Sequence, residues 1–551
     1  MAKYVIGIDF GTLSGRCVLI DVNSGVECAE SVLEYPHGVM SFRLPDGTPL
    51  PPDYALQHPS DYLDVLRFTI ADVLDSAQIT ARDVVGIGID FTASTVLPVD
   101  EHMCPLCMKD GFREDKHSYV KLWKHHSAQM YADEITELAR QRGEEWLDIY
   151  GGVVSCEWLL PKLLQIARES PRVYAATHRF LEAADWLSYE MTGVETRSAV
   201  FAGYKCLWNA ETGYPSNDFM AALDPALDGV VGTKILEEVL AMDKIAGHIS
   251  ENGSLITGLE IGTPVALPMI DAHASMAALN ITHDGDFIAV AGTSLGQMVN
   301  STEVIKIPGI CGYIKDGVIP GLYTYEAGQA AVGDMLAWFV NNCIPEPYFA
   351  AAERLGVNLH TLLEEKASQL APGQSGLVAL DWWNGNRSVL VNYELTGLIV
   401  GLKLSTRPEE IYRALIESAA YGLRRIVEQY EKYGIKVNDI CIAGGIARKN
   451  AMMMQIYADV LNKRVRASQN AQTGALGSAL YAAVAAGAYR DIAEAAQALS
   501  ANDFIDYEPS AECVEIYDKL YSEYLALHDY FGEDNGMMVR LGKISKAASV
   551  K

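Results

Sequence analysis

The sequence predicts an α/β protein with two lobes, and two observations favour this fold class. Apolar strands run into glycine turns in both halves of the chain: residues 4–8 precede the turn at 9–12, and residues 287–290 precede the turn at 292–294. Strand and helix patterns also alternate along the chain, as an α/β fold requires. Two similar loops in the two halves suggest two related lobes.

After the opening strand, the first predicted elements are a helix and a second buried strand. Ser60 is a suitable N-cap for the helix. Its apolar residues follow at three- and four-residue steps and are Leu63, Leu66, Ile70 and Val73. Residues 84–90 read Val-Val-Gly-Ile-Gly-Ile-Asp, which is typical of a buried strand.

The second half of the chain repeats this alternation. Residues 406–409 have the form of a capping box, so a helix is expected from there. Its apolar face consists of Ile411, Leu415, Ala419, Leu423 and Ile426. The strand at residues 440–443 then ends in Gly444 and Gly445, and a helical pattern covers residues 447–461.

The composition is that of a large acidic protein with a substantial core. The chain has 551 residues, half of them hydrophobic, which is enough for several domains. Its formal net charge of -28 disfavours binding to nucleic acid and to anionic membranes. We see no signal peptide and no run of about 18 apolar residues, so a cytoplasmic protein is expected.

The ten cysteines are sparse and irregularly spaced, which predicts reduced thiols and not a disulfide framework. Cys104 and Cys107 have the Cys-x-x-Cys spacing that can hold zinc, but a closed zinc site needs four ligands and no second pair follows. A metal here would need His117, His125 or His126 to fold back. Unligated thiols are therefore expected in this loop.

Each glycine turn has two interpretations. Glycine lets the backbone approach a bound group closely, and nearby hydroxyl and amide groups can donate hydrogen bonds to phosphate oxygens. Taken alone, each turn is more often a simple hairpin. The presence of both turns, together with a third glycine segment, favours an enzyme that uses ATP.

The third glycine segment also allows two interpretations. A helix that begins just after Gly444 and Gly445 would direct free amide hydrogens and a positive dipole end toward a nucleotide. The alternative is a tight packing turn between strand and helix. The sequence contains neither a Gly-x-x-x-x-Gly-Lys-Ser/Thr loop nor a Gly-x-Gly-x-x-Gly fingerprint, so phosphates must be held in another way.

Short motifs extend over nearly the whole chain, at residues 6–12, 185–187, 192–193, 270–274, 291–294, 444–445 with Asn450, Gln455 and 458–459, and 475–479. In this order they resemble the FGGY carbohydrate kinases of the actin-like ATPase superfamily. The resemblance implies two lobes, each built on a ribonuclease H-like mixed sheet with flanking helices. The first lobe would cover residues 1–281 and the second residues 282–551.

The resemblance also implies phosphoryl transfer from ATP to a sugar hydroxyl. Asp271 follows an apolar run and would be the general base that orients the attacking hydroxyl. Judged from its position alone, Asp271 is more often a capping residue. Asp9 would hold Mg2+, through water, and its alternative role is an Asx-turn.

For the nucleotide, the resemblance assigns residues from both halves of the chain. Those expected to contact the β- and γ-phosphates are Gly11, Thr12, Gly292 and Thr293. Those expected at the adenosine end are Gly444, Gly445 and Asn450.

The sugar-binding residues implied by the resemblance are Ala93, Trp123, Lys205, Asp271 and Glu326. Lys205 can donate to the carbonyl or hydroxyls of a sugar and Glu326 can accept from them, unless the two form a structural ion pair. Residues 123–126, 204–208 and 326–329 would face the sugar, and they are most similar to family members that phosphorylate L-ribulose in L-arabinose catabolism. D-ribulose, ribitol and xylulose are alternative substrates.

A rival interpretation is an actin-like ATPase that serves as a chaperone or filament switch. Asp271 and the polar residues assigned to the sugar argue against it. The chain also leaves no room for a β-rich peptide-binding domain after the second lobe. The expected partner is a small-molecule sugar, with a homodimer as a further possibility.

Overall fold

The computed structural model describes residues 3–501 and 503–549, which divide into two compact units. The first unit comprises Met1–Thr282, Gly312–Thr324 and Gln472–Ala501, and the second comprises His283–Cys311, Tyr325–Ala471 and Asn502–Lys551. The expectation was two continuous lobes, 1–281 and 282–551. The structure differs because two later segments pack with the first unit.

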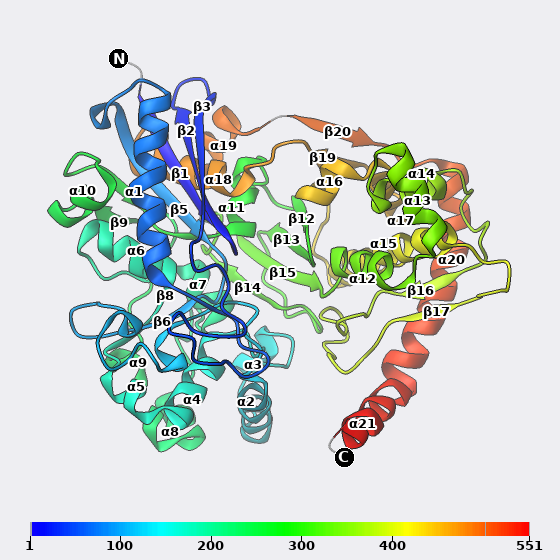
Figure 1. The fold of residues 1–551 in the computed structure, drawn as a ribbon, viewed down its shortest axis with the longest axis horizontal. Helices are drawn as coiled ribbons and strands as arrows, with labels where there is room; N and C mark the ends of the chain where they lie inside the picture. Colours follow the sequence, from blue (N-terminus) through cyan, green and yellow to red (C-terminus); the bar gives the residue numbers. More distant parts are fainter. Residues whose placement is uncertain (1–2, 502, 550–551) are drawn as a thin grey trace. The chain divides into compact units, whose positions relative to one another are not determined.

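The first unit is built on a mixed sheet with the strand order β3-β2-β1-β5-β10-β9 (Figure 1). Its strands are β1 (Tyr4–Phe10), β2 (Ser14–Asp21), β3 (Glu27–Glu34), β5 (Val84–Phe91), β9 (Ile245–His248) and β10 (Pro264–Ala266). A short strand, β11 (Met269–Ile270), pairs with the end of β5. β1 and β5 are parallel, and their register places Asp9 beside Asp90.

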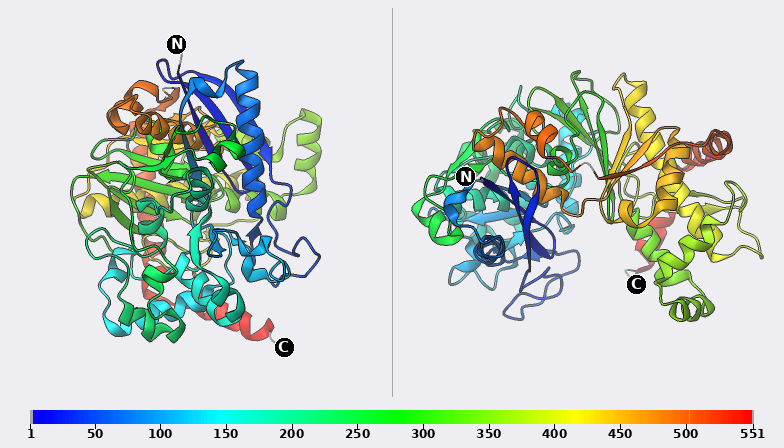
Figure 2. Two further views of the ribbon diagram at one scale, coloured as in Figure 1. Left: turned by 90° about the vertical axis from the view of Figure 1, so that its left-hand side faces the viewer. Right: turned by 90° about the horizontal axis from the view of Figure 1, so that it is seen from above.

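Two helices cover the opposite faces of this sheet, α1 (Pro59–Ser76) and α18 (Thr473–Ala485) (Figures 1 and 2). A Cβ at Gly15 would lie 2.5 Å from Val65 of α1, whereas a Cβ at Gly7 would lie 1.9 Å from the Ala475 carbonyl oxygen of α18. Gly15 pairs with Phe10, three residues after Gly7, so the two glycines point to opposite faces. Both helices therefore pack unusually close to the sheet.

A smaller antiparallel sheet of the first unit has the order β4-β7-β6-β8. Its strands are β4 (Leu56–Gln57), β6 (Val96–Val99), β7 (Val120–Lys121) and β8 (Arg179–Glu182). The other helices and one further strand of this unit are α2 (Gln129–Arg142), α3 (Trp146–Ile149), α4 (Leu159–Glu169), α5 (Pro171–Ala176), α6 (Ala183–Thr192), α7 (Ala199–Lys205), α8 (Asn217–Leu223), α9 (Val230–Thr233), α10 (Glu251–Thr257), α11 (Asp271–Ala278), α19 (Ile492–Leu499) and β14 (Gly312–Lys315).

The second unit contains another mixed sheet, in which β15 (Tyr323–Gln329), β13 (Leu295–Ser301), β12 (Phe287–Ala291), β18 (Ile440–Ala443), β19 (Val465–Ser468) and β20 (Phe504–Tyr507) follow in this order. β16 (Val378–Leu380) and β17 (Leu398–Val400) form a separate antiparallel sheet of two strands. The helices are α12 (Gly333–Cys343), α13 (Glu346–Leu355), α14 (Leu359–Ser368), α15 (Pro408–Lys432), α16 (Gly445–Lys449), α17 (Ala451–Leu461), α20 (Ala511–Asp529) and α21 (Met537–Ser549). Because both units combine a mixed sheet with helices, the predicted α/β class is confirmed.

Three predicted helix features differ in detail. The helix expected over residues 447–461 is divided into α16 and α17, because Asn450 caps the second of them. The N-cap of α15 is Arg407, and that of α1 is His58 in place of the expected Ser60. Among the described helices, none has both the length and the apolar character that crossing a membrane requires.

Candidate functional site

Three aspartates of the first unit form an acidic cluster at the carboxyl ends of neighbouring strands. Asp9 and Asp90 lie side by side near the ends of β1 and β5. Asp271 begins α11 directly after β11, which pairs with the end of β5. The carboxyl ends of parallel strands meet at one edge of a sheet, which is where ligands bind in open α/β sheets.

Burial and mutual repulsion decide how this cluster is charged. Burial raises the pKa of Asp90 well above its usual range, and the negative charges of Asp9 and Asp271 raise it further. Ser478 Oγ donates a hydrogen bond of 2.6 Å to Asp90 Oδ2 and only partly offsets this effect. Burial also raises the pKa of Asp9, but a hydrogen bond with Asp90 and the charge of Arg16 oppose the shift. Asp90 is therefore the protonated member of the pair, and Asp9 the carboxylate.

The first turn of α18 lies against the aspartate pair. A Cβ at Gly474 would lie 3.0 Å from Asp90 Oδ1 and 3.4 Å from Asp9 Cγ. This approach depends on Gly88, where a Cβ would lie 2.2 Å from the Ser478 carbonyl oxygen of the same helix. The positive end of the α18 dipole consequently faces the cluster and favours the charge on Asp9.

Asp90 was missed as a site residue at the level of sequence, although a signal was present. Both central strands end in the same pattern, Gly7-x-Asp9 and Gly88-x-Asp90. Because side chains alternate along a strand, the glycine and the aspartate of each pattern share one face. The repeated pattern indicates that a helix packs against the same face from which the acids project.

The raised pKa of Asp90 predicts how the free energy of unfolding changes with pH. Above about pH 4 the unfolded chain releases the Asp90 proton while the folded chain retains it, so this group lowers the stability as the pH rises. In the Asp90→Asn variant this loss is absent. The unfolding free energy of the variant relative to wild type, from urea titrations, should therefore increase between pH 4.5 and 7.5.

Asp83→Asn is the matched control for this experiment. Hydrogen bonds from Thr80 lower the pKa of Asp83, so its contribution to stability is already complete above about pH 4. The difference between this variant and wild type should be constant over the same pH range. Parallel behaviour of the two variants would contradict the assignment of a protonated Asp90.

The turn between β1 and β2 holds two of the predicted phosphate-binding residues. The Gly11 amide donates to the Ser14 carbonyl oxygen at 3.0 Å. Gln57 Nε2 donates to the Thr12 carbonyl oxygen at 2.8 Å, and Trp123 Nε1 lies 3.4 Å from Thr12 Oγ1. The structure therefore brings Trp123, a predicted sugar contact, next to Thr12.

Two more predicted sugar contacts lie in the same unit. Ala93 is half-buried in the loop between β5 and β6. Lys205 is the last residue of α7 and is buried. The ring of the preceding residue, Tyr204, packs on His273 of α11, with the ring centroids 4.6 Å apart. This contact joins the helix of Lys205 to the helix that begins with Asp271.

In the second unit, Gly292 and Thr293 form an exposed turn between β12 and β13. The Gly292 carbonyl oxygen accepts a hydrogen bond of 3.1 Å from the Gly333 amide. The Thr293 carbonyl oxygen accepts bonds of 3.0 and 3.2 Å from the Val332 and Asp334 amides. The turn is thus fixed to the first turn of α12.

Gly444 and Asn450 have clear structural roles in this unit. Gly444 has a φ of 98°, and a Cβ there would lie 2.4 Å from the Ala291 carbonyl oxygen, so the segment is a tight packing turn. Asn450 is buried, and its Oδ1 accepts a hydrogen bond of 2.8 Å from the Met453 amide at the start of α17. Gly445 is exposed at the start of α16. Contacts of these residues with adenosine stay a prediction.

Glu326 lies on β15 and is buried. Glu326 forms an ion pair with Arg387, in which Arg387 Nη2 lies 3.8 Å from Glu326 Oε1. Carboxylate oxygens are hydrogen-bond acceptors, which suits a residue that contacts sugar hydroxyls.

The Cys-x-x-Cys loop and one histidine cluster bear on metal binding. Cys107 is buried and Cys104 is half-buried, and burial raises the pKa of both thiols. In the described part of the chain, His37, His58 and Asp61 bring three potential ligand atoms within 4.8 Å of one another. The two imidazole rings are stacked, 4.4 Å apart and 20° from parallel, and His37 Nδ1 lies 2.6 Å from Asp61 Oδ1.

Comparison with known proteins gives three consistent findings. Residues 4–278 match the N-terminal domain of the FGGY family of carbohydrate kinases, and residues 287–486 match its C-terminal domain. The chain is 46% identical to a ribulokinase of Bacillus licheniformis over 543 residues, which covers 98% of each chain. It is 46% identical to a ribulokinase of Geobacillus thermodenitrificans over 545 residues, 98% of this chain and 96% of the relative. A solved xylulose kinase from Rhodospirillum rubrum has a similar fold, with a TM-score of 0.77 at 23% identity over 96% of this chain and 98% of that structure.

Proposed function

Because this chain belongs to the FGGY family of carbohydrate kinases, we propose that it uses ATP to phosphorylate L-ribulose at O5, giving L-ribulose 5-phosphate. The observation that carries this proposal is 46% identity, over nearly the full length of both chains, to proteins named ribulokinases. The solved xylulose kinase supports the fold alone. A kinase of another pentulose or polyol is the second candidate, since relatives of the same fold act on other substrates.

Asp271 is the proposed general base. It stands at the edge of the sheet beside Asp9 and Asp90, and its Oδ1 accepts a hydrogen bond of 2.6 Å from the Ala272 amide, which fixes the carboxylate. Phosphoryl transfer through a loose transition state needs positioning more than strong basicity. A fixed carboxylate can orient the sugar hydroxyl and accept its proton late in the reaction.

Asp9 is the proposed residue for Mg2+. The residue fits this ion, because the Asp9 carboxylate lies near a strand end and magnesium prefers oxygen ligands from few carboxylates. A bound Mg2+ would neutralise part of the negative charge on the phosphates. The role of the chain is to keep Asp9 ionised, through the proton held on Asp90 and the charge of Arg16.

The nucleotide contacts are proposed for each unit separately. In the first unit, Gly11 and Thr12 would contact phosphate oxygens from the β1–β2 turn. In the second unit the proposed phosphate contacts are Gly292 and Thr293. The proposed adenosine contacts of that unit are Gly444, Gly445 and Asn450. For the sugar, the proposed contacts are Ala93, Trp123, Lys205, Asp271 and Glu326.

Release of ADP should depend strictly on L-ribulose. A coupled assay at saturating Mg-ATP, with a panel of pentuloses, polyols and glycerol, measures this dependence. L-Ribulose should have the highest kcat/KM of the panel. Slow hydrolysis that no sugar accelerates would instead support an actin-like ATPase switch, and a higher kcat/KM for xylulose or ribitol would support the second candidate.

A further inference from the structure

A buried lysine of the first unit connects the two chain segments that carry Ala93 and Trp123. Lys162 lies on α4 and is fully buried. Its Nζ donates hydrogen bonds to the carbonyl oxygen of Ser94 at 2.6 Å and to that of Leu122 at 3.0 Å. Ser94 follows Ala93 and Leu122 precedes Trp123, so one ammonium group sets the distance between the two segments.

The Leu122 carbonyl also closes the turn that presents Trp123. The His125 amide donates to this carbonyl at 3.0 Å, which leaves Trp123 and Lys124 as the central residues of a β-turn. Lys162 therefore binds the carbonyl on which the turn depends. The third acceptor of Lys162 Nζ is the carbonyl oxygen of Lys121, at 3.4 Å, in the last residue of β7.

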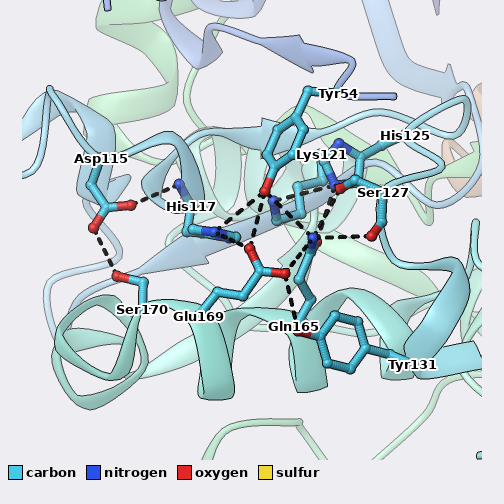
Figure 3. A network of polar contacts seen from close by, with 10 residues as sticks. All are labelled: Tyr54, Asp115, His117, Lys121, His125, Ser127, Tyr131, Gln165, Glu169 and Ser170. Atoms are coloured by element: carbon cyan, nitrogen blue, oxygen red, sulfur yellow. Dashed lines mark hydrogen bonds and ion pairs between the residues drawn. The ribbon is translucent and has the colours of Figure 1, made fainter. Parts of the chain in front are cut away.

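His125, the last residue of this turn, belongs to the polar network drawn in Figure 3. His125 was expected to face the sugar with its neighbours, but the structure buries it completely. His125 Nδ1 accepts a hydrogen bond from the Ala55 amide at 3.3 Å, so Nε2 carries the proton, with Ser127 Oγ at 2.8 Å and Gln165 Oε1 at 3.2 Å as its acceptors. Burial, with the charges of Lys121 and Lys162, holds the pKa of His125 well below its usual range and keeps the ring neutral.

The residues that hold the turn come from one face of α4. Lys162, Gln165 and Glu169 follow at three- and four-residue steps, so they form a polar stripe that runs from the buried part of the helix to its exposed end at Glu169. Glu169 extends the network, because its carboxylate accepts bonds from Gln165 Nε2 at 3.1 Å and Tyr131 OH at 3.0 Å (Figure 3). The two buried members, Lys162 and Gln165, would be costly in a core without hydrogen-bond partners.

We propose that Lys162 is a positioning residue for the sugar: it fixes Ala93 and Trp123 at the separation that a bound pentulose requires. The inference rests on the proposed function, which places both residues at the sugar. Three carbonyl acceptors can be satisfied together by an ammonium group, which has three donors in a compact arrangement. An apolar replacement would leave buried carbonyls without this donor, and the two segments would move to recover hydrogen bonds.

Lys162→Met is the direct test, since it keeps the length of the side chain and removes the donors. We expect KM for the sugar to rise by about tenfold or more and the preference for L-ribulose over other pentuloses to fall, with KM for ATP unchanged, because misplacement by about 1 Å can cost up to about 10²-fold. Lys519→Met, at an exposed position of α20, is the matched control and should behave as wild type. A merely structural role would lower the active fraction and the Tm without changing KM for the sugar.

A second measurement uses the wild-type enzyme and does not depend on the folding of Lys162→Met. Burial lowers the pKa of Lys162 to about 8, against the opposing charges of Glu182 and Glu157, and burial lowers that of the adjacent Lys121 to about 7. Above pH 8 the neutral amine has only two donors for three carbonyls. KM for the sugar should therefore rise between pH 8 and 9.5 in wild type and stay level in Lys162→Arg.

The outcomes separate this inference from the proposed function. Unchanged KM for the sugar in folded Lys162→Met overturns the positioning role, and so does a wild-type KM that is level up to pH 9.5. If the wild-type enzyme prefers a sugar other than L-ribulose, the proposed substrate is wrong. The same KM comparison, made with that sugar, then still tests Lys162.

Discussion

Replacing Asp271 with Asn should lower kcat by roughly 10²- to 10⁴-fold while leaving ATP binding intact, because the amide cannot accept the proton of the sugar hydroxyl. The side chain would keep its hydrogen bond with the Ala272 amide, so the start of α11 should be preserved. Steady-state assays of ADP formation give kcat, and calorimetric titration with ATP gives the Kd.

Asp284→Asn is the matched control for this variant. Asp284 is an exposed aspartate of the second unit whose Oδ1 accepts a hydrogen bond from the Thr302 amide at 2.9 Å. Its replacement should leave kcat within about twofold of wild type, as for most exposed positions. Turnover of Asp271→Asn at the level of this control would remove Asp271 as the base.

Gly7→Ala should lower the free energy of unfolding by about 3 kcal/mol or more, since overpacking against the backbone cannot be relieved by a side-chain movement. The new Cβ would lie 1.9 Å from the Ala475 carbonyl oxygen and 2.6 Å from the Ala479 amide nitrogen, both in the backbone of α18. Urea unfolding of the two proteins measures the difference.

Gly296→Ala provides the comparison for this effect. Gly296 is also a strand glycine, in β13, but a Cβ there would meet no heavy atom of the described residues within 4 Å. The change in unfolding free energy should stay below about 0.5 kcal/mol. Equal loss of stability in both variants would show that strand glycines matter for a reason other than the packing of α18.

Gly7→Ala should also weaken catalysis in the fraction that remains folded. The face on which Gly7 points toward α18 also carries Asp9, and the first turn of α18 lies against Asp9 and Asp90. A helix displaced from the sheet would withdraw its positive dipole end from the aspartate pair. The packing of one helix thus connects stability with the charge state of the site.

Part of this protein followed from its sequence alone. The α/β class, a strand at residues 84–90, and the membership of the FGGY family could be predicted, because buried strands have an apolar pattern and the family motifs occur in a fixed order. The aspartates at strand ends were also identifiable, at positions 9 and 271. Each strand and each aspartate is a local feature that a short segment shows, and the family follows from the order of such segments along the chain.

Other features were decided only by the tertiary structure. Asp90 joins the cluster because β5 lies next to β1, His125 turns inward because α4 supplies Gln165, and residues 472–501 return to the first unit because glycines let α18 approach the sheet. Lys162 is distant in sequence from both carbonyls that it joins. These properties depend on contacts between distant segments, and the free energy of such contacts is set by packing and burial, which a sequence pattern does not contain.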